Sequence, residues 1–142
     1  MAVELLERER CYSIVGGFLE VFHYFGPGLA ESVYTGALVH ALEDRGHHVA
    51  REVGVEILFK GRPVAWQRLD MVVDERIIIE VKVAEKLAAY AQAQVVSYLR
   101  ATRFEVGLLL HVGRSADWKR FIDSPKRSPY FRTLVQAGPE PR

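Results

Sequence analysis

Two carboxylates and a lysine stand in neighbouring apolar segments of this chain. Asp70 lies in the apolar run 69–73, and Glu80 and Lys82 lie two residues apart in the apolar run 77–83. Because strand side chains alternate between faces, Glu80 and Lys82 would share one face of a strand. Burying such charges is unfavourable unless they meet a partner or a metal ion. Two carboxylates and an amine on one patch are the minimum for metal-assisted hydrolysis of a phosphodiester bond.

These residues meet only if the two runs pair in one particular register. Residues 74–76 form a polar break suited to a hairpin loop between two strands. With this three-residue loop, Val73 pairs with Ile77, and Asp70 then lies directly opposite Glu80. A two-residue loop would shift the pairing by one and send the carboxylates to opposite faces, unless a bulge corrected it. The site hypothesis therefore includes a prediction of register.

The composition is that of an ordinary globular protein. The 142 residues are 49% hydrophobic and 26% charged, with a formal net charge of +1. We expect a single domain over residues 1–123 and an irregular or partly disordered tail over residues 124–142, where prolines recur. Residues 100–142 carry more basic than acidic side chains, an excess that could contact phosphates or form an ordinary solvated surface.

Several classes of protein are not favoured by the sequence. The single cysteine, Cys11, allows no internal disulfide and fits a reducing cytoplasm. Charged residues crowd the first ten positions, so we expect no secretory leader, and no apolar run approaches the ~20 residues that span a bilayer. Neither a zinc-ligand spacing, a phosphate-binding glycine loop nor a serine–histidine arrangement is evident. We therefore expect a cytoplasmic protein without membrane contact.

Periodicity predicts the elements that would hold the candidate residues. Apolar spacing and breaker residues predict helices over residues 3–25, 29–45 and 87–101, and strands near residues 48–59, 64–73, 77–83, 106–112 and 118–122. The Gly16-Gly17 pair weakens the first helix and favours close packing against a neighbour. The order of elements predicts an α/β fold, with a central mixed sheet that has helices on both sides.

This arrangement resembles the PD-(D/E)xK, or restriction-endonuclease-like, nuclease superfamily. The resemblance rests on Asp70, on the Glu80–Lys82 triplet of the next strand, and on the helix and strand that follow. Residues 28–34, Gly-Leu-Ala-Glu-Ser-Val-Tyr, match the signature that names the GxxExxY family. Gln94 and Tyr98 match a Q-x-x-x-Y helix motif of RecB-like members. The sequence departs from the pattern shortly before the glutamine, where a histidine is missing.

The resemblance implies a restriction-endonuclease-like topology and a role for each motif residue. Asp70 and Glu80 would bind Mg²⁺ or Mn²⁺, with the Val81 carbonyl as a further ligand and Glu31 assisting from its helix. Lys82 would stabilise negative charge at the reacting phosphate or position the attacking water.

Three further residues would contact the nucleic-acid substrate. Gln94 and Tyr98 lie four residues apart on one helix face and would hold the lysine or contact the nucleic-acid backbone. Arg68 is expected to share a face with Asp70 and could bind the scissile phosphate.

Each of these residues also has a structural interpretation. The two carboxylates could form an ordinary ion cluster with Lys82 and Arg68. Glu31 could stabilise the N-terminus of its helix through the helix dipole. Gln94 and Tyr98 could be a polar stripe packed on the sheet. The sequence leaves these interpretations open.

The functional hypothesis is a divalent-metal-dependent nuclease that cleaves DNA or RNA with metal-activated water. The alternative is a non-catalytic nucleic-acid-binding or assembly protein that retains the fold, and a hydrolase of smaller phosphodiesters is a third hypothesis. Since no separate DNA-reading domain is evident, specificity would come from a homodimer, a partner protein or a preference for nucleic-acid structure. The choice between DNA and RNA stays open.

Overall fold

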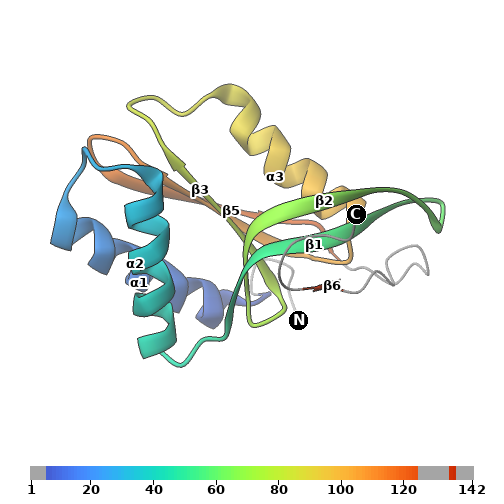
Figure 1. Cartoon of the computed structure of the whole chain (residues 1–142), viewed down its shortest axis with the longest axis horizontal. Helices are drawn as coiled ribbons and strands as arrows, with labels where there is room; N and C mark the ends of the chain where they lie inside the picture. Colours follow the sequence, from blue (N-terminus) through green and yellow to red (C-terminus); the bar gives the residue numbers. More distant parts are fainter. Residues whose placement is uncertain (1–5, 125–134, 137–142) are drawn as a thin grey trace.

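One mixed β-sheet forms the centre of the molecule, with α1 and α2 on one face and α3 on the other (Figure 1). The computed structural model describes residues 6–124 and 135–136. The elements are α1 (Arg8–Phe25), α2 (Glu31–Asp44), β1 (Val49–Phe59), β2 (Arg62–Val73), β3 (Ile77–Val83), α3 (Ala89–Ala101), β4 (Val106–Val112), β5 (Ala116–Ile122) and β6 (Val135–Gln136). The predicted order of three helices and five strands is confirmed, and β6 follows it.

The sheet has the strand order β5-β4-β3-β2-β1-β6. Strands β3 and β4 are parallel and are joined through α3, whereas the other neighbouring strands are antiparallel. A parallel pair requires such a crossover, and a hairpin suffices for an antiparallel pair. The β1–β2 hairpin extends beyond the rest of the sheet (Figure 1). The predicted α/β fold of restriction-endonuclease-like topology, with a mixed sheet between helices, is confirmed.

The two faces of the sheet have separate cores. Strand β3 illustrates the division, because Ile77, Ile79 and Val81 pack into the core beneath α1 and α2, whereas Ile78 packs with Leu99 of α3. All residues from Ile77 to Val81 are buried, as expected for a strand with helices on both faces. The predicted alternation of β3 is thereby confirmed, and it leaves Glu80 and Lys82 on the side of α3.

All three helices are shorter than predicted, and α3 begins at Ala89 rather than at residue 87. The helix expected over residues 3–25 begins at Arg8, and residues 3–5 lie outside the described part of the chain. The second helix begins at Glu31 rather than at residue 29, because the backbone of its N-cap residue, Ala30, is extended, with φ −71° and ψ 153°. Close packing at Gly17 is confirmed, since a Cβ there would lie 2.9 Å from Leu42 Cδ2 of α2.

Two strand ends also differ from the prediction. The expected linker 60–63 is a turn of Lys60 and Gly61, both with positive φ, so β2 already begins at Arg62. Strand β5 begins at Ala116, two residues earlier than predicted. Strand β6 falls within the segment that was expected to be irregular and pairs with β1. Residues 125–134 and 137–142 of that segment lie outside the described residues.

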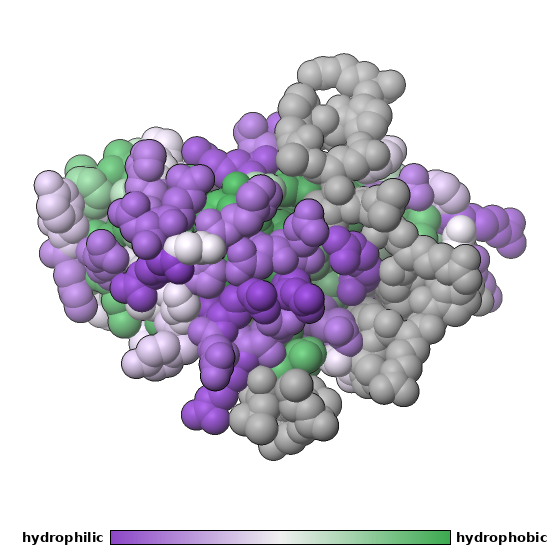
Figure 2. Space-filling model, turned by 90° about the horizontal axis from the view of Figure 1, so that it is seen from below, coloured by the Kyte–Doolittle hydropathy of each residue, from purple (hydrophilic) through white to green (hydrophobic). Residues whose placement is uncertain are grey.

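The described surface is mainly hydrophilic where it is seen from below, and hydrophobic residues form separate patches there (Figure 2). Among the described helices, none combines the length and the apolar character needed to cross a bilayer.

Candidate active site

The β2–β3 hairpin has the predicted register. Val73 pairs with Ile77 and Met71 pairs with Ile79, so residues 74–76 form the connecting loop. One further step of this register places Asp70 opposite Glu80. The two side chains share a hydrogen bond, and the Asp70 backbone amide donates a second one to the Glu80 carboxyl group. Two carboxyl groups from neighbouring strands therefore meet, as the register prediction required.

The strand alternation is interrupted at Asp70. Leu69 and Val72 belong to the same core cluster, although side chains three residues apart in a regular strand point to opposite faces. Opposite Asp70 in the β1–β2 register, Glu52 has a φ of 51°, which a non-glycine residue seldom adopts. Such irregularities bend a strand and re-aim side chains, often beside functional sites. The distortion lets Asp70 face Glu80 while Leu69 stays in the core.

The Glu80 carboxyl group is buried and favours its protonated form. Only 3% of the residue is exposed. Burial, followed by the charge of the neighbouring Asp70, raises the pKa of Glu80 to about 8, whereas Lys82 acts in the opposite direction. A hydrogen bond between two carboxyl groups needs a proton on one of them. Near neutral pH the pair therefore holds one proton and less than its full negative charge.

Lys82 is close to the pair but does not neutralise it. Its Nζ atom lies 3.7 Å from Glu80 Oε2, longer than a charge-assisted hydrogen bond, and 29% of its side chain is exposed. The amine is thus both near the carboxyl pair and open to an approaching anion. The Val81 side chain, between Glu80 and Lys82, packs in the core beneath α1 and α2.

Helix α3 brings Gln94 and Tyr98 to the carboxyl pair. Gln94 Nε2 donates a hydrogen bond of 2.8 Å to the Tyr98 hydroxyl oxygen, and Gln67 Nε2 donates one of 3.3 Å to the same atom. Burial, with the negative charge of Glu80 and Asp70, raises the pKa of Tyr98 to about 12. Within the described structure, Gln94 Oε1 is buried without a hydrogen-bond partner. Gln94 and Tyr98, the two residues of the Q-x-x-x-Y motif, therefore lie in one polar cluster with Asp70, Glu80 and Gln67.

Gln67, which the sequence analysis did not identify, lies beside Tyr98 in the polar cluster. Its neighbour Arg68 lies on a different face of the sheet from the one predicted. Gln67 contacts Tyr98 of α3, and Leu69 packs in the core with Leu99 of the same helix. Arg68, which lies between them, then leaves the sheet on the other face. The shared face predicted for Arg68 and Asp70 does not occur, because the interruption of the strand lies between them. Regular alternation from Asp70 places Arg68 on the face of the site, and only the interruption of the strand places Gln67 there instead.

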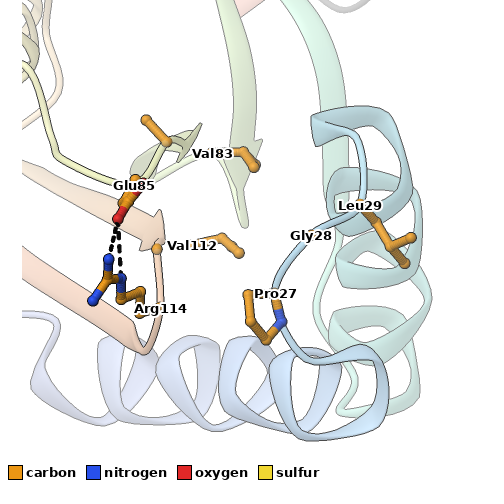
Figure 3. Close-up of a pocket in the computed structure, with 9 residues that line it drawn as sticks. Pro27, Gly28, Leu29, Val83, Glu85, Val112 and Arg114 are labelled. Carbon is orange, nitrogen blue, oxygen red and sulfur yellow. Dashed lines mark hydrogen bonds and ion pairs between the residues drawn. The ribbon is translucent and has the colours of Figure 1, made fainter.

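A cleft lies at the end of β3, beside the loop that leads into α2 and its first residue, Glu31. The cleft has a volume of about 440 Å³ and separates the loop that contains Pro27 and Gly28 from the ends of β3 and β4. Figure 3 shows Pro27 facing Val83 and Val112 across it. Glu31, the first residue of α2, follows this loop and is exposed.

Three-ligand metal clusters are absent from the described residues. No group of three or more histidine, cysteine, aspartate or glutamate side chains there could hold a metal ion. The structure therefore brings Asp70 and Glu80 together but does not add Glu31 to them. Two carboxylates nevertheless suit Mg²⁺ or Mn²⁺, because Mg²⁺ commonly binds through one or two carboxylates and keeps several waters. The raised pKa of Glu80 shows that its ionised form lacks sufficient positive charge nearby, and a bound cation would supply that charge.

A hydrogen-bonded serine–histidine–aspartate triad, which the sequence analysis did not identify, lies away from the carboxyl pair. His47 Nδ1 lies 2.7 Å from Asp74 Oδ2, and His47 Nε2 lies 2.8 Å from Ser13 Oγ. Ser13 stands inside α1, where backbone amides bond to carbonyls of the preceding turn and cannot stabilise an oxyanion. Arg10 also donates to Asp74 Oδ2. We therefore interpret the hydrogen bonds among Ser13, His47 and Asp74 as a structural connection between α1, the segment before β1 and the β2–β3 turn.

Comparison with known proteins places the chain in a family. A model of the PD-(D/E)XK nuclease superfamily matches residues 8–121, a range that includes the carboxyl pair, Lys82, Gln94 and Tyr98. No curated protein sequence matches the chain. The crystal structure of SSO0001 is similar at a TM-score of 0.46 and 18% sequence identity; the match covers 68% of this chain and 55% of that protein, so the chain spans about half of its length. The chain belongs to the PD-(D/E)XK nuclease superfamily.

Proposed function

We propose that this protein is a divalent-metal-dependent nuclease whose active site is the Asp70–Glu80 pair. The observation that carries the proposal is the meeting of these two carboxyl groups, one of them buried with a pKa of about 8. A purely structural carboxylate is stabilised in its ionised form by hydrogen-bond donors. Glu80 is instead stabilised in its protonated form, in which it can share a proton with Asp70. Such a pair is suited to exchange the proton for a cation.

Each residue of the cluster has a part in this proposal. Asp70 and Glu80 would bind Mg²⁺ or Mn²⁺, with the Val81 carbonyl as a further ligand. The bound ion would supply Lewis-acid stabilisation of phosphoryl charge and lower the pKa of water at the site. Lys82, partly exposed and 3.7 Å from Glu80, would hold the negatively charged scissile phosphate.

The residues of α3 would keep the site in position. Tyr98 Oη receives hydrogen bonds from both Gln94 and Gln67, so its own proton remains available for a carboxylate or a phosphate oxygen. The Gln94 Oε1 atom, which is buried without a partner among the described residues, would accept a hydrogen bond from a water or from a substrate group. We assign Gln94 and Tyr98 to positioning the reacting groups, and the substrate-binding role predicted for Arg68 receives no support from its face of the sheet.

In the motif of residues 28–34, the glycine and the tyrosine stabilise the loop before α2, which leaves the glutamate as the motif residue without such a role. Gly28 has a φ of 112°, and the Tyr34 hydroxyl donates to the Gly26 carbonyl at 2.6 Å and accepts from the Leu29 amide at 3.2 Å. Glu31, the first residue of α2, is exposed. This division of tasks supports membership of the GxxExxY family and an assisting role for Glu31 once substrate and metal are bound.

Metal-dependent cleavage tests the proposal directly. Purified protein would be incubated with single-stranded, duplex and branched DNA and RNA, in Mg²⁺, Mn²⁺ or EDTA. We expect cleavage that requires the metal and that disappears in Asp70→Asn and Lys82→Met. Glu75→Gln, an exposed carboxylate in the same hairpin, is the matched control and should retain activity.

Two other outcomes would contradict the nuclease assignment. Binding of nucleic acid without cleavage, unchanged in Asp70→Asn and Lys82→Met, would favour a non-catalytic binding or assembly protein. Metal-dependent hydrolysis restricted to small diesters would favour the third hypothesis.

A further inference from the structure

A second cleft lies between α1 and the edge strand β5, away from the carboxyl pair. It has a volume of about 560 Å³, within the usual range for small-molecule sites. Leu108 of β4 lines it and belongs to the core beneath α1 and α2, whereas Glu80 adjoins Tyr98 of α3. The cleft therefore opens on the opposite face of the sheet from the candidate active site.

Three guanidinium groups from different elements line this cleft. Arg8 belongs to α1, Arg45 follows α2, and Arg120 belongs to β5. Among the described residues that line the cleft, none is acidic. Glu20 is 3.5 Å from Arg45 Nη2, but 61% of its side chain is exposed, so solvent weakens the pair. The local charge favours an anionic ligand.

The position of Arg45 depends on the glycine pair of α1. A Cβ at Gly16 would lie 2.8 Å from Arg45 Nη1, and one at Gly17 would lie 3.5 Å from Arg45 Nε. Glycine in a helix interior is destabilising relative to alanine. Gly16 itself lines the cleft, so its missing side chain is what lets the guanidinium lie across the helix at this place.

Two exposed aromatic side chains complete the cleft. Tyr12 on α1 is 82% exposed and Trp118 on β5 is 45% exposed, and both line it. Aromatic rings and guanidinium planes stack on planar heterocycles, and guanidinium groups also bind phosphate through paired hydrogen bonds. Cations beside aromatic and apolar surface suit a ligand that has both a planar ring and a phosphate.

We propose that the cleft between α1 and β5 binds a nucleoside phosphate. The base lies against Trp118 and Tyr12, and the phosphate is held by Arg45 and Arg8. This site is distinct from the carboxyl pair, and it needs no metal.

Calorimetric titration of the full chain in EDTA tests this proposal. AMP, adenosine and inorganic phosphate would be compared as ligands. We expect saturable binding of AMP below about 1 mM, and weaker binding of adenosine and of phosphate, because each supplies only half of the contacts. Arg45→Ala and Trp118→Ala should each weaken AMP binding by about tenfold. An absence of saturable AMP binding, or binding of oligonucleotides alone, would show the proposal to be wrong.

Two glycine variants separate binding from folding. Gly16→Ala and Gly36→Ala both place alanine inside a helix, so both should keep or raise the melting temperature. A Cβ at Gly36 meets nothing within 4 Å, whereas one at Gly16 displaces the Arg45 guanidinium. Only Gly16→Ala should weaken AMP binding, and Asp70→Asn should leave it unchanged. Equal AMP binding in the two glycine variants, or loss of binding in Asp70→Asn, would overturn the proposed location.

Discussion

Asp74 and Glu80 lie in the same hairpin and show how differently one fold treats two carboxyl groups. Asp74 accepts hydrogen bonds from Arg10 Nε at 2.9 Å and from the His48 amide at 2.8 Å, and it contacts His47 Nδ1 at 2.7 Å. Although burial opposes the shift, these contacts hold the pKa of Asp74 below its usual value. The ionised form of Asp74 is the form that the fold stabilises.

Glu80 is the opposite case. Burial and the nearby Asp70 raise its pKa to about 8, and the partly exposed Lys82 compensates only in part. What separates the two carboxyl groups is the set of donors around them rather than burial alone. The Asp74 carboxylate, with three contacts, joins elements of the fold, whereas the Glu80 carboxyl group, which faces another carboxyl group, is stabilised in its protonated form.

The largest difference between the two sites is expected in activity. Asp70→Asn and Glu80→Gln should lower metal-dependent cleavage by about 10²–10³-fold or more, because several kcal/mol of stabilisation at the phosphate depend on the ion they would bind. Asp74→Asn should retain cleavage when it is measured below its own melting temperature. Steady-state cleavage in Mg²⁺ checks this, and equal losses in all three variants would remove the distinction.

The stability of the two sites should depend on pH in opposite ways. The folded pKa of Glu80, about 8, exceeds the ordinary value of 4.5, so without metal the free energy of unfolding should fall as pH rises from about 4.5 to 8. The slope is at most about 1.4 kcal/mol per pH unit. The lowered pKa of Asp74 contributes stability above its ordinary value of 3.8 that is lost as pH falls below it.

Urea unfolding in EDTA at a series of pH values measures both effects. Glu80→Gln should remove most of the fall between pH 4.5 and 8 and should unfold at higher urea than the parent at the upper end. Saturating Mg²⁺ should also reduce the fall, because the ion binds the ionised pair. A parent protein whose stability rises across this window would contradict the shared proton.

A loss of stability is expected at the other site. Asp74→Asn should lower the free energy of unfolding by about 1.5–3 kcal/mol, because hydrogen bonds to a charged acceptor are weakened. Asparagine is a suitable replacement, since Asp74 has a φ of 55° and asparagine tolerates that region. Thermal and urea unfolding at pH 7 would measure the change, and the exposed neighbour Glu75→Gln provides the control.

The smallest effect concerns Ser13. Its hydroxyl oxygen lies 2.8 Å from His47 Nε2, whereas Asp74 contacts the other ring nitrogen, so Ser13→Ala should cost about 0.5–1.5 kcal/mol of stability. Nuclease activity should not change. A covalent adduct of Ser13 with a serine-reactive fluorophosphonate would contradict the structural interpretation of this triad, and mass spectrometry of the intact protein would detect it.

Local patterns in the sequence were sufficient for most of the fold. The bounds of β3 and β4 matched the prediction at Ile77–Val83 and Val106–Val112, because a continuous apolar run between breakers has few alternatives. The length of the loop 74–76 was enough to predict that Asp70 lies opposite Glu80, since side-chain direction in a strand follows from register alone.

Positions that depend on irregular backbone could not be predicted in this way. The interruption at Asp70 reverses the expected face of Arg68 and brings Gln67 to Tyr98, and it coincides with the positive φ of Glu52 on another strand. Nothing in the local sequence of β2 indicates it. The strand β6 and the contact between His47 and Asp74 also join distant segments.

The sequence by itself determined which residues form the carboxyl pair and which strands bear them, because residue type and alternation are local properties. Only the tertiary structure decided the charge that each group carries. Glu80 and Asp74 are both carboxyl groups in a single hairpin, and their opposite pKa shifts arise from neighbours supplied by other strands, by α1 and by the loop before β1. Electrostatic free energy depends on distances and burial across the fold, and these exist only once the chain has folded.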